Sequence, residues 1–258
     1  MTILDTIAAY AKIRVESDQA KLPLEMLKQM LQGRGEGNKF YANLKKPCIS
    51  FICEIKKASP SKGVISEAFP YQEIAKEYEA AGAEAISCLT EPKWFLGSDD
   101  IFKEVRSLVQ TPMLRKDFTV DPYQIYQARL MGANAVLLIT SLMDTKTLYN
   151  YLALCDDLGL AALVETHDDK EIVQALSAGA QIIGVNNRNL KDFSVDINNS
   201  KRLRELVGTK AIFVAESGIK GPEDIAQLKL EGVDAVLIGE TLMRASDKAK
   251  MLNLMRNA

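Results

Sequence analysis

The chain has 258 residues, of which 47% are hydrophobic and 26% are charged, and 32 Lys and Arg residues nearly balance 34 Asp and Glu residues for a net charge of −2. This composition permits a large core, and the balanced charge argues against nucleic acid or another polyanion as a partner. The first residues lack a basic segment ahead of an apolar one and no run of 18 apolar residues occurs, so we expect no export signal, no membrane span and a cytoplasmic protein.

Cysteine and histidine are too few and too scattered to suggest a disulfide framework or a metal centre. Cys48, Cys53, Cys88 and Cys155 form no C-x-x-C pair and mostly lie within apolar runs, which favours reduced, buried thiols. His167 is the single histidine of the sequence, and we interpret it as a helix cap or a surface group. We therefore predict no metal site.

The N-terminal part of the chain is predicted to be helical. Apolar residues recur at helical spacing over residues 4–15, and a second helical stretch follows over residues 24–31 before a segment rich in glycine. This part is too short to fold by itself. We expect one domain over residues 1–258, with residues 1–47 as a helical extension packed on a main body formed by residues 48–258.

One short phrase occurs four times in the main body: a glycine follows a helical pattern, and an apolar run comes directly after it. The glycines are Gly82, Gly132, Gly179 and Gly232, which lie 50, 47 and 53 residues apart. A glycine that ends a helix with positive φ, followed by a strand buried on both faces, explains the phrase. Two βα units of about 25 residues fit each interval, so the phrase marks every second strand of a repeated α/β array.

Eight apolar segments are predicted as strands, and amphipathic helices alternate with them. The strands are Ile49–Ile55, Ala85–Leu89, Pro112–Asp117, Ala135–Ile139, Ala161–Glu165, Ile182–Asn186, Ile212–Glu216 and Ala235–Ile238. Helix starts are indicated at Ser98, Asp121-Pro122, Asp144, Asp168 and Gly221-Pro222. The pattern predicts an α/β fold, a single (β/α)8 TIM barrel with an N-terminal helical extension. The alternative is an open doubly wound sheet, which normally has a G-x-G-x-x-G turn that this chain lacks.

Charged residues follow directly on the odd-numbered predicted strands, where barrel active sites lie. The first strand ends in Glu54 and Lys56, which share a face, and the third and fifth end in Lys116 and Glu165. The seventh ends in Glu216. Lysines and carboxylates that face one mouth change each other's pKa and suit acid and base catalysis. The alternative is that they form ion pairs that only stabilise the mouth.

Other segments at the strand ends suit an anion or an aromatic ligand. Ser217-Gly218, Gly239 and the segment from Ser59 to Gly63 offer backbone N–H groups where barrels bind phosphate, although each segment is also explained as an ordinary turn. Trp94 and Phe95 lie in the loop after the second strand. They either cover an aromatic ligand or pack on the N-terminal extension.

In seven motifs the chain closely resembles the indole-3-glycerol-phosphate synthase family. The motifs are EIKKASPSKG (54–63), LTEPKWFLGS (89–98), LRKDF (114–118), VETH (164–167), IGVNNRNL (183–190), AESGI (215–219) and LIGE (237–240). The resemblance implies that 1-(2-carboxyphenylamino)-1-deoxyribulose 5-phosphate closes an indole ring and loses carbon dioxide and water. It implies no cofactor and no metal. We expect a monomer whose partner is this small phosphorylated substrate.

The resemblance also implies roles for individual residues. Lys116 matches the general acid of ring closure and Glu165 the base or electrostatic partner of the cationic intermediates. Glu54 and Lys56 match a second acid/base pair that assists dehydration, and Asn186 completes the catalytic set.

The remaining implied residues bind substrate. Asn186 and Arg188 orient the anthranilate part and its carboxylate, and the phosphate is bound by Ser59, Ser217, Gly218 and Gly239. We also expect substrate contacts from Phe95, Phe118, Leu137 and Leu237. Glu240 departs from relatives that have serine there, and we expect its side chain to point away from the phosphate.

A lysine acts best as an acid when its pKa lies below the usual value of about 10.4, and we expect neighbouring Lys56 or burial to lower the pKa of Lys116. Two alternatives to the synthase remain at this point. One is an aldolase that forms a Schiff base with a lysine at a strand end. The other is a phosphate-binding barrel without catalysis.

Overall fold

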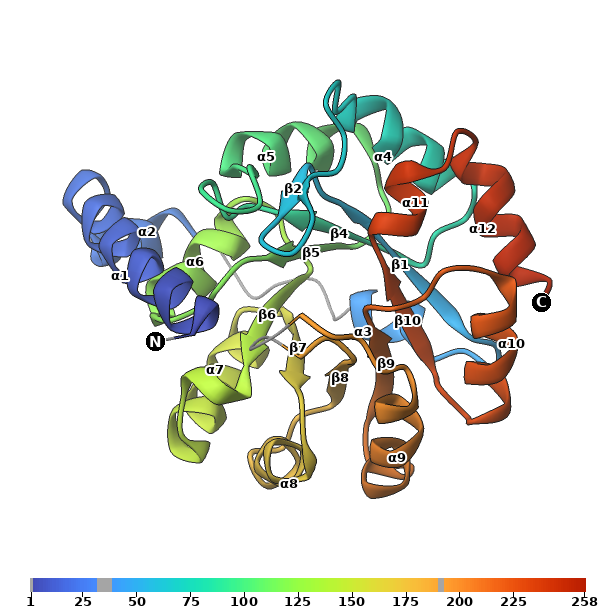
Figure 1. Cartoon of the computed structure of the whole chain (residues 1–258). Helices are drawn as coiled ribbons and strands as arrows, with labels where there is room; N and C mark the ends of the chain where they lie inside the picture. The colour runs from blue at the N-terminus through green and yellow to red at the C-terminus, as the bar shows by residue number, and fades with distance from the viewer. Residues whose placement is uncertain (1, 32–38, 190–192) are drawn as a thin grey trace.

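A closed barrel of parallel strands forms the centre of the molecule (Figure 1). The computed structural model describes residues 2–31, 39–189 and 193–258. Over these residues the barrel has eight strands: β1 (Ser50–Ile55), β4 (Ala85–Leu89), β5 (Met113–Lys116), β6 (Ala135–Ile139), β7 (Ala161–Thr166), β8 (Ile182–Asn186), β9 (Ile212–Glu216) and β10 (Ala235–Ile238). Parallel pairing of β1 with β10 closes the ring, so the closed barrel is confirmed and the open sheet is wrong.

Helices surround the barrel in chain order (Figure 1). They are α4 (Tyr71–Ala80), α5 (Asp99–Leu108), α6 (Pro122–Leu130), α7 (Thr145–Asp157), α8 (Asp169–Ser177), α9 (Asn198–Val207), α10 (Pro222–Leu230), α11 (Glu240–Arg244) and α12 (Lys248–Arg256), with a short 3₁₀ helix η1 (Thr140–Leu142). The predicted cap side chains of Ser98, Asp121, Asp144 and Asp168 each accept a backbone N–H of the first turn. Pro222 begins α10 as predicted.

The repeated glycines have the conformation that the sequence predicts. Gly82, Gly132, Gly179 and Gly232 have φ of +75°, +81°, +89° and +73°, and each lies between a helix and the next even-numbered barrel strand. A side chain at such φ is strained. The phrase is therefore confirmed as a helix-to-strand junction.

The barrel interior is layered, and its upper layer is charged. Ile52, Leu114, Leu163 and Val214 belong to one buried apolar cluster inside the barrel. Two residues further along the same strands come Glu54, Lys116, Glu165 and Glu216. Because residues i and i+2 share a face of a strand, these four side chains also face the axis, at the C-terminal end.

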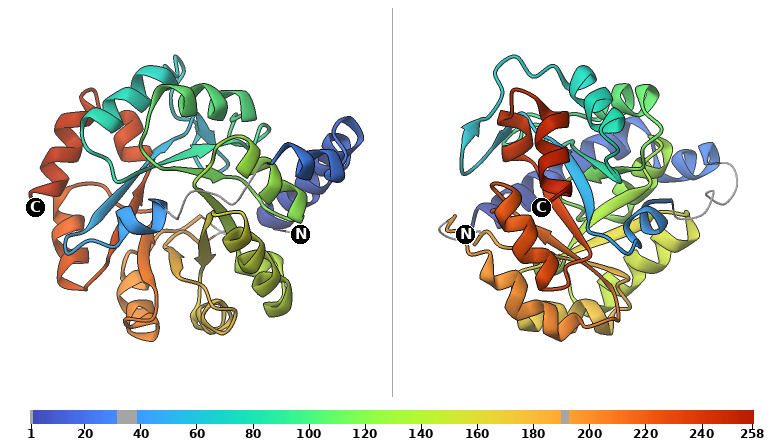
Figure 2. Two further views of the ribbon diagram at one scale, coloured as in Figure 1. Left: turned by 180° about the vertical axis from the view of Figure 1, so that it is seen from behind. Right: turned by 90° about the vertical axis from the view of Figure 1, so that its right-hand side faces the viewer.

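The N-terminal part forms α1 (Ile3–Lys21), α2 (Leu24–Met30) and α3 (Lys39–Leu44). The first two lie outside the ring beside α6 (Figure 1). In the rear view α3 lies in front of the strands (Figure 2, left). Its Phe40 and Leu44 are fully buried in the interior cluster and close the N-terminal end of the barrel. The glycines expected to end the second helix lie outside the described residues.

A small hairpin follows β1 that the sequence analysis did not predict. β2 (Ala58–Ser59) pairs antiparallel with β3 (Gly63–Val64), and Gly63 has φ of +63°. Strands of two residues are too short for an alternating pattern, so no periodic signal marks this hairpin. The hairpin brings the segment from Ser59 to Lys62 to the rim of the barrel.

The cysteines are free as predicted, and Cys53, Cys88 and Cys155 are buried as predicted. For Cys48, which is exposed, the expectation of a buried thiol is wrong. Across the described ranges, no helix combines the length and the apolar character needed to cross a membrane.

Candidate active site

A cavity of about 820 Å³ opens at the C-terminal ends of the strands. Every site residue predicted from the sequence lines it: Glu54, Lys56, Ser59, Phe95, Lys116, Phe118, Leu137, Glu165, Asn186, Arg188, Ser217, Gly218, Leu237 and Gly239. Ile3, Leu4 and Ile7 of α1 line the same cavity. The extension therefore contributes an apolar wall to the site.

Lys116 lies at the centre of the charged layer. Its Nζ donates to Glu216 Oε2 at 2.8 Å and to Glu165 Oε2 at 3.1 Å, and its side chain is 12% exposed. Asn186 Nδ2 donates to the other oxygen of Glu165 at 3.2 Å. The geometry fixes one ammonium between two buried carboxylates.

This arrangement changes the pKa values of all three groups. Burial by itself would lower the pKa of Lys116, but the carboxylates of Glu216, Glu165 and Glu54 outweigh it and raise this pKa above its usual value. The expectation of a lowered pKa is wrong, because carboxylates surround this lysine. Burial disfavours the charge on Glu165, yet Lys116 and His167 outweigh burial and lower the pKa of Glu165. Burial, helped by Glu165, raises the pKa of Glu216 to about 7.

Glu216 is a member of the cluster that the sequence analysis left out of its site residues. Gly184 makes room for it, since a Cβ at Gly184 would lie 2.1 Å from Glu216 Oε1. That oxygen is buried and has no hydrogen-bond partner among the described residues. The available signal was that Glu216 ends the seventh strand as Lys116 ends the third.

Glu54 and Lys56 form an ion pair on the β1 side of the cavity. Their side chains lie on one face of the strand end, as predicted. Gly239 permits the pair, because a Cβ there would lie 2.2 Å from Glu54 Oε2 and 2.9 Å from Lys56 Nζ. The ammonium of Lys56 is thus paired with the carboxylate of Glu54, two residues before it in the sequence.

The opposite rim has the features of an anion site. Ser217 and Gly218 have consecutive positive φ of +66° and +87°. Asn187 Nδ2 donates to Ser217 O at 3.2 Å and fixes this turn. Thr241 Oγ1 of α11 donates to Ile219 O at 2.6 Å and joins this helix to the loop after β9. Backbone N–H groups held in this way suit a phosphate.

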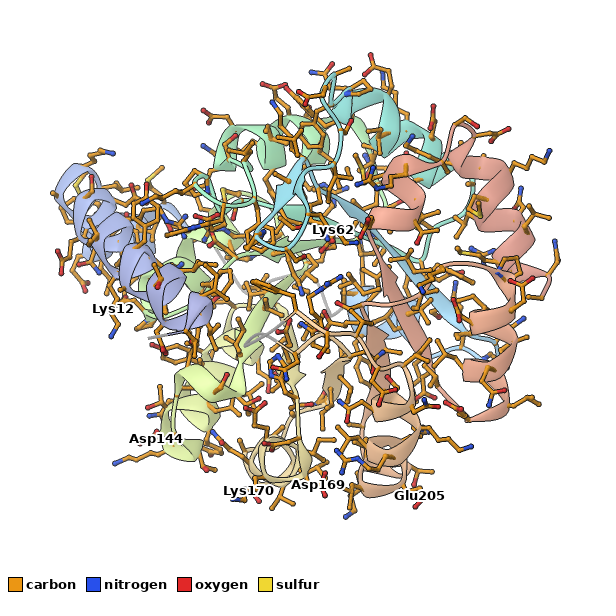
Figure 3. The ribbon with its side chains drawn as sticks, viewed as in Figure 1. Lys12, Lys62, Asp144, Asp169, Lys170 and Glu205 are labelled. Carbon is orange, nitrogen blue, oxygen red and sulfur yellow. The ribbon has the colours of Figure 1, made fainter. Side chains whose placement is uncertain are left out.

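Basic side chains lie on the same rim. Lys62, Lys220 and Arg244 line the cavity, and Lys62 lies inside the ring of helices, whereas Lys12 and Lys170 lie outside it (Figure 3). Glu240 also lines the cavity, 3.7 Å from Lys62 and 3.2 Å from Arg244. Its carboxylate therefore pairs with the basic side chains of the rim.

Comparisons with known proteins identify the family of this chain. A family model described as indole-3-glycerol phosphate synthase matches residues 4–255. The indole-3-glycerol phosphate synthase of Ruminiclostridium cellulolyticum is 55% identical over 258 residues, which cover 99% of each chain. That of Lachnoclostridium phytofermentans is 50% identical over 268 residues, again 99% of each chain. The chain belongs to the indole-3-glycerol phosphate synthase family.

Solved structures with little sequence identity share the fold. A 3-hexulose-6-phosphate synthase has a TM-score of 0.63 at 15% identity, covering 81% of this chain and 99% of that one. A thiamine phosphate pyrophosphorylase from Pyrococcus furiosus has a TM-score of 0.61 at 18% identity, covering 85% and 95%. At this identity the likeness concerns the barrel alone.

In this member of the indole-3-glycerol phosphate synthase family, Trp94 packs on the N-terminal extension, whereas Phe95 faces the cavity. The Trp94 ring packs edge-on against Tyr10 of α1, 5.5 Å between centroids, so it contacts the extension. Phe95 lines the cavity and lies 6.1 Å from the Phe118 ring. The buried Glu91 carboxylate accepts the backbone N–H groups of both residues and holds the loop in place.

The same extension is anchored beside Lys116. Arg14 of α1 donates to both carboxylate oxygens of Asp117, at 2.6 and 3.0 Å. Asp117 is buried next to Lys116 and also accepts from Thr90. This bidentate pair fixes α1 to the end of β5.

Replacing Arg14 with methionine is expected to lower the free energy of unfolding by about 2–3 kcal/mol at pH 7, because a buried carboxylate loses its bidentate partner. Burial disfavours charge on Asp117, but Arg14 and Arg115 outweigh it and lower its pKa. This stabilisation is therefore present above the unfolded pKa of about 4 and is lost as pH falls below it. Urea unfolding of both proteins at pH 7 and pH 3 measures the difference. Lys21→Gln removes an exposed pair with Asp18 and is the control, with no expected change. A change of the same size in both variants would contradict the prediction.

His167 occupies a different environment from the one the sequence suggested. Asp168, and not His167, is the N-cap of α8. The His167 side chain is 19% exposed and lies between Glu165 and Glu171. The interpretation as a cap or surface group is wrong.

Proposed function

We propose that this cavity is the site at which 1-(2-carboxyphenylamino)-1-deoxyribulose 5-phosphate is converted to indole-3-glycerol phosphate, carbon dioxide and water. Family membership supports the reaction. The observation that carries the assignment of residues is the buried Lys116 ammonium held between Glu165 and Glu216. An ammonium that is largely buried and held in one position suits general acid catalysis at a carbonyl group.

Ring closure is assigned to Lys116. Its Nζ gives a proton to the carbonyl oxygen of the ribulose part, and the aromatic carbon that bears the carboxylate attacks the carbonyl carbon. Positive charge develops on the ring and its nitrogen, and the Glu165 carboxylate stabilises it. Glu216, 2.8 Å from Nζ and with its pKa raised to about 7, can return a proton to Lys116.

Decarboxylation and dehydration complete the reaction. Loss of carbon dioxide returns an electron pair to the ring and leaves an alcohol on the former carbonyl carbon. The hydroxyl group then leaves as water while the adjoining CH₂ group loses a proton, which forms the carbon–carbon double bond of the five-membered ring of the indole. We assign this step to the Glu54 and Lys56 pair, in which the ammonium protonates the hydroxyl and the carboxylate accepts the carbon-bound proton.

The ends of the substrate are assigned to the two rims. Arg188 and Asn186 would orient the anthranilate part and its carboxylate, and Arg188 is fixed by hydrogen bonds to Asn186 and Phe193. The phosphate is assigned to Ser59, Ser217, Gly218 and Gly239. Phe95, Phe118, Leu137 and Leu237 would contact the aromatic ring between them.

The direct test is to incubate the purified protein with the carboxyphenylamino-deoxyribulose phosphate and record indole fluorescence. We expect product with turnover in the ordinary range for enzymes, about 1–10³ per second. No product at high enzyme concentration would contradict the proposal. The family assignment already favours this reaction over the Schiff-base aldolase and over a barrel that binds phosphate without catalysis.

A further inference from the structure

His167 lies between two carboxylates, one inside the site and one outside it. Its Nε2 is 3.4 Å from Glu165 Oε1, and its Nδ1 is 3.0 Å from Glu171 Oε2. The buried Nε2 has no hydrogen bond among the described residues, but it faces a carboxylate oxygen. Either neutral form of the ring would turn the lone pair of one nitrogen toward a carboxylate, and only the protonated ring presents an N–H on both sides. The geometry thus favours an imidazolium.

The surrounding backbone fixes the imidazole in this place. The backbone N–H of His167 donates to the same Glu171 oxygen at 2.7 Å, and Asn199 Nδ2 of α9 donates to His167 O at 3.2 Å. The charged groups around the ring come from three elements. They are Glu165 of β7, Glu171 of α8 and, beyond Glu165, Lys116 of β5.

Glu165 is held by a different partner on each side. Lys116 contacts Oε2, whereas Asn186 and His167 face Oε1. When Lys116 gives its proton to the substrate, Glu165 loses the cation on one side and becomes, beside Glu216, a base that competes for a proton. A second cation at Oε1 opposes protonation of the carboxylate at that moment.

We propose that His167, protonated and held by Glu171, is a positioning residue that fixes Glu165 against Lys116 and stops it from taking the proton meant for the substrate. The role in catalysis rests on the proposed function, while the charge on the ring does not. His167 does not line the cavity. Its loss therefore affects kcat and leaves KM nearly unchanged.

The electrostatics agree with this geometry. Burial disfavours charge on His167, but Glu165 and Glu171 outweigh burial and raise its pKa to about 10. An unperturbed histidine titrates near pH 6.5 and would be neutral in most molecules at pH 8. His167 is expected to stay charged through that range.

The first experiment needs no activity. Because the chain has one histidine, its imidazole gives a single set of NMR signals that needs no assignment. We expect both ring nitrogens to remain protonated at pH 8. A titration midpoint near 6.5 would overturn the proposal, independently of which reaction the enzyme catalyses.

The second experiment uses three variants. His167→Gln keeps a donor but removes the charge, and we expect kcat to fall about tenfold, with KM within about twofold. We also expect the acidic limb of its pH profile to move up by about one unit, because Glu165 is more easily protonated. Asp169→Asn is the control, since it removes an exposed carboxylate from the same helix end on the outside of the ring (Figure 3).

The third variant, Glu171→Gln, keeps an acceptor for the backbone N–H but removes the outer charge. We expect the imidazole midpoint to fall, and kcat to decline as pH rises through the new midpoint. The proposal would be overturned if kcat were unchanged in His167→Gln, or if Asp169→Asn lost as much kcat as His167→Gln. It would also be overturned if kcat of Glu171→Gln did not decline as pH rises through the imidazole midpoint. If the unaltered protein made no indole product, the proposed function would fail, and the NMR titration would still decide the charge.

Discussion

Replacing Lys116 with methionine is expected to lower kcat/KM by a factor of about 10² or more, the usual contribution of a positioned general acid. Methionine keeps the length of the side chain and removes the proton donor and the charge. Glu165 and Glu216 then face each other without the ammonium that lies 3.1 and 2.8 Å from them. Steady-state kinetics with the indole product as the signal measure the change.

Two further variants separate chemistry from folding. Lys170→Gln replaces an exposed lysine on the outside of the ring and is expected to keep full activity. In the double variant Lys116→Met, Glu216→Gln one carboxylate is removed with the ammonium, so it is expected to fold stably and to stay inactive. Activity in the double variant close to that of the unaltered protein would show that Lys116 is not the acid.

Replacing Glu216 with glutamine is expected to lower kcat by about tenfold to 10²-fold, and also to make the protein more stable above neutral pH. Burial raises the pKa of Glu216 to about 7, whereas a glutamate in an unfolded chain titrates near 4. The folded protein therefore binds this proton more tightly than the unfolded chain. The corresponding stability is complete below about pH 4 and is lost as pH rises through 7.

A glutamine cannot ionise, so the variant does not lose stability in this window. Between pH 4 and pH 8 the free energy of unfolding of the variant should rise, relative to that of the unaltered protein, by up to about 4 kcal/mol. Urea unfolding of both proteins across this range gives the difference directly. Glu205→Gln on the outside of α9 is the control and should give a flat difference (Figure 3). A flat difference for Glu216→Gln as well would contradict the raised pKa.

The scaffold could be predicted from the sequence because its signals are local. A glycine such as Gly132 ends a helix by its own backbone preference, and a cap such as Ser98 bonds an N–H three residues away. Burial on both faces makes each parallel strand continuously apolar. The hairpin after β1 was not predicted, because its strands of two residues are too short for any periodic signal.

Most residues of the candidate site could be predicted from the sequence, but the contacts between them could not. Strand ends identified Lys116 and Glu165, but the contact between Lys116 and Glu216 joins residues 100 positions apart and exists only because the barrel closes. The direction of the pKa shift of Lys116 was predicted wrongly for the same reason, since the sequence does not show which charged groups come into contact. His167 could have been found, because it lies two residues after Glu165 in an extended segment and four before Glu171.

The composition of the upper layer has a consequence for the proton balance of the reaction. Glu54, Glu165 and Glu216 outnumber Lys56 and Lys116 by one, and Glu216 is the member whose pKa lies near neutrality. Glu216 is therefore the carboxyl group of this layer that can hold a proton near neutral pH. A substrate that binds as a carboxylate anion and leaves as indole-3-glycerol phosphate, carbon dioxide and water consumes one proton per turnover. We expect the layer to supply that proton from within and to recover it from solvent after the product leaves.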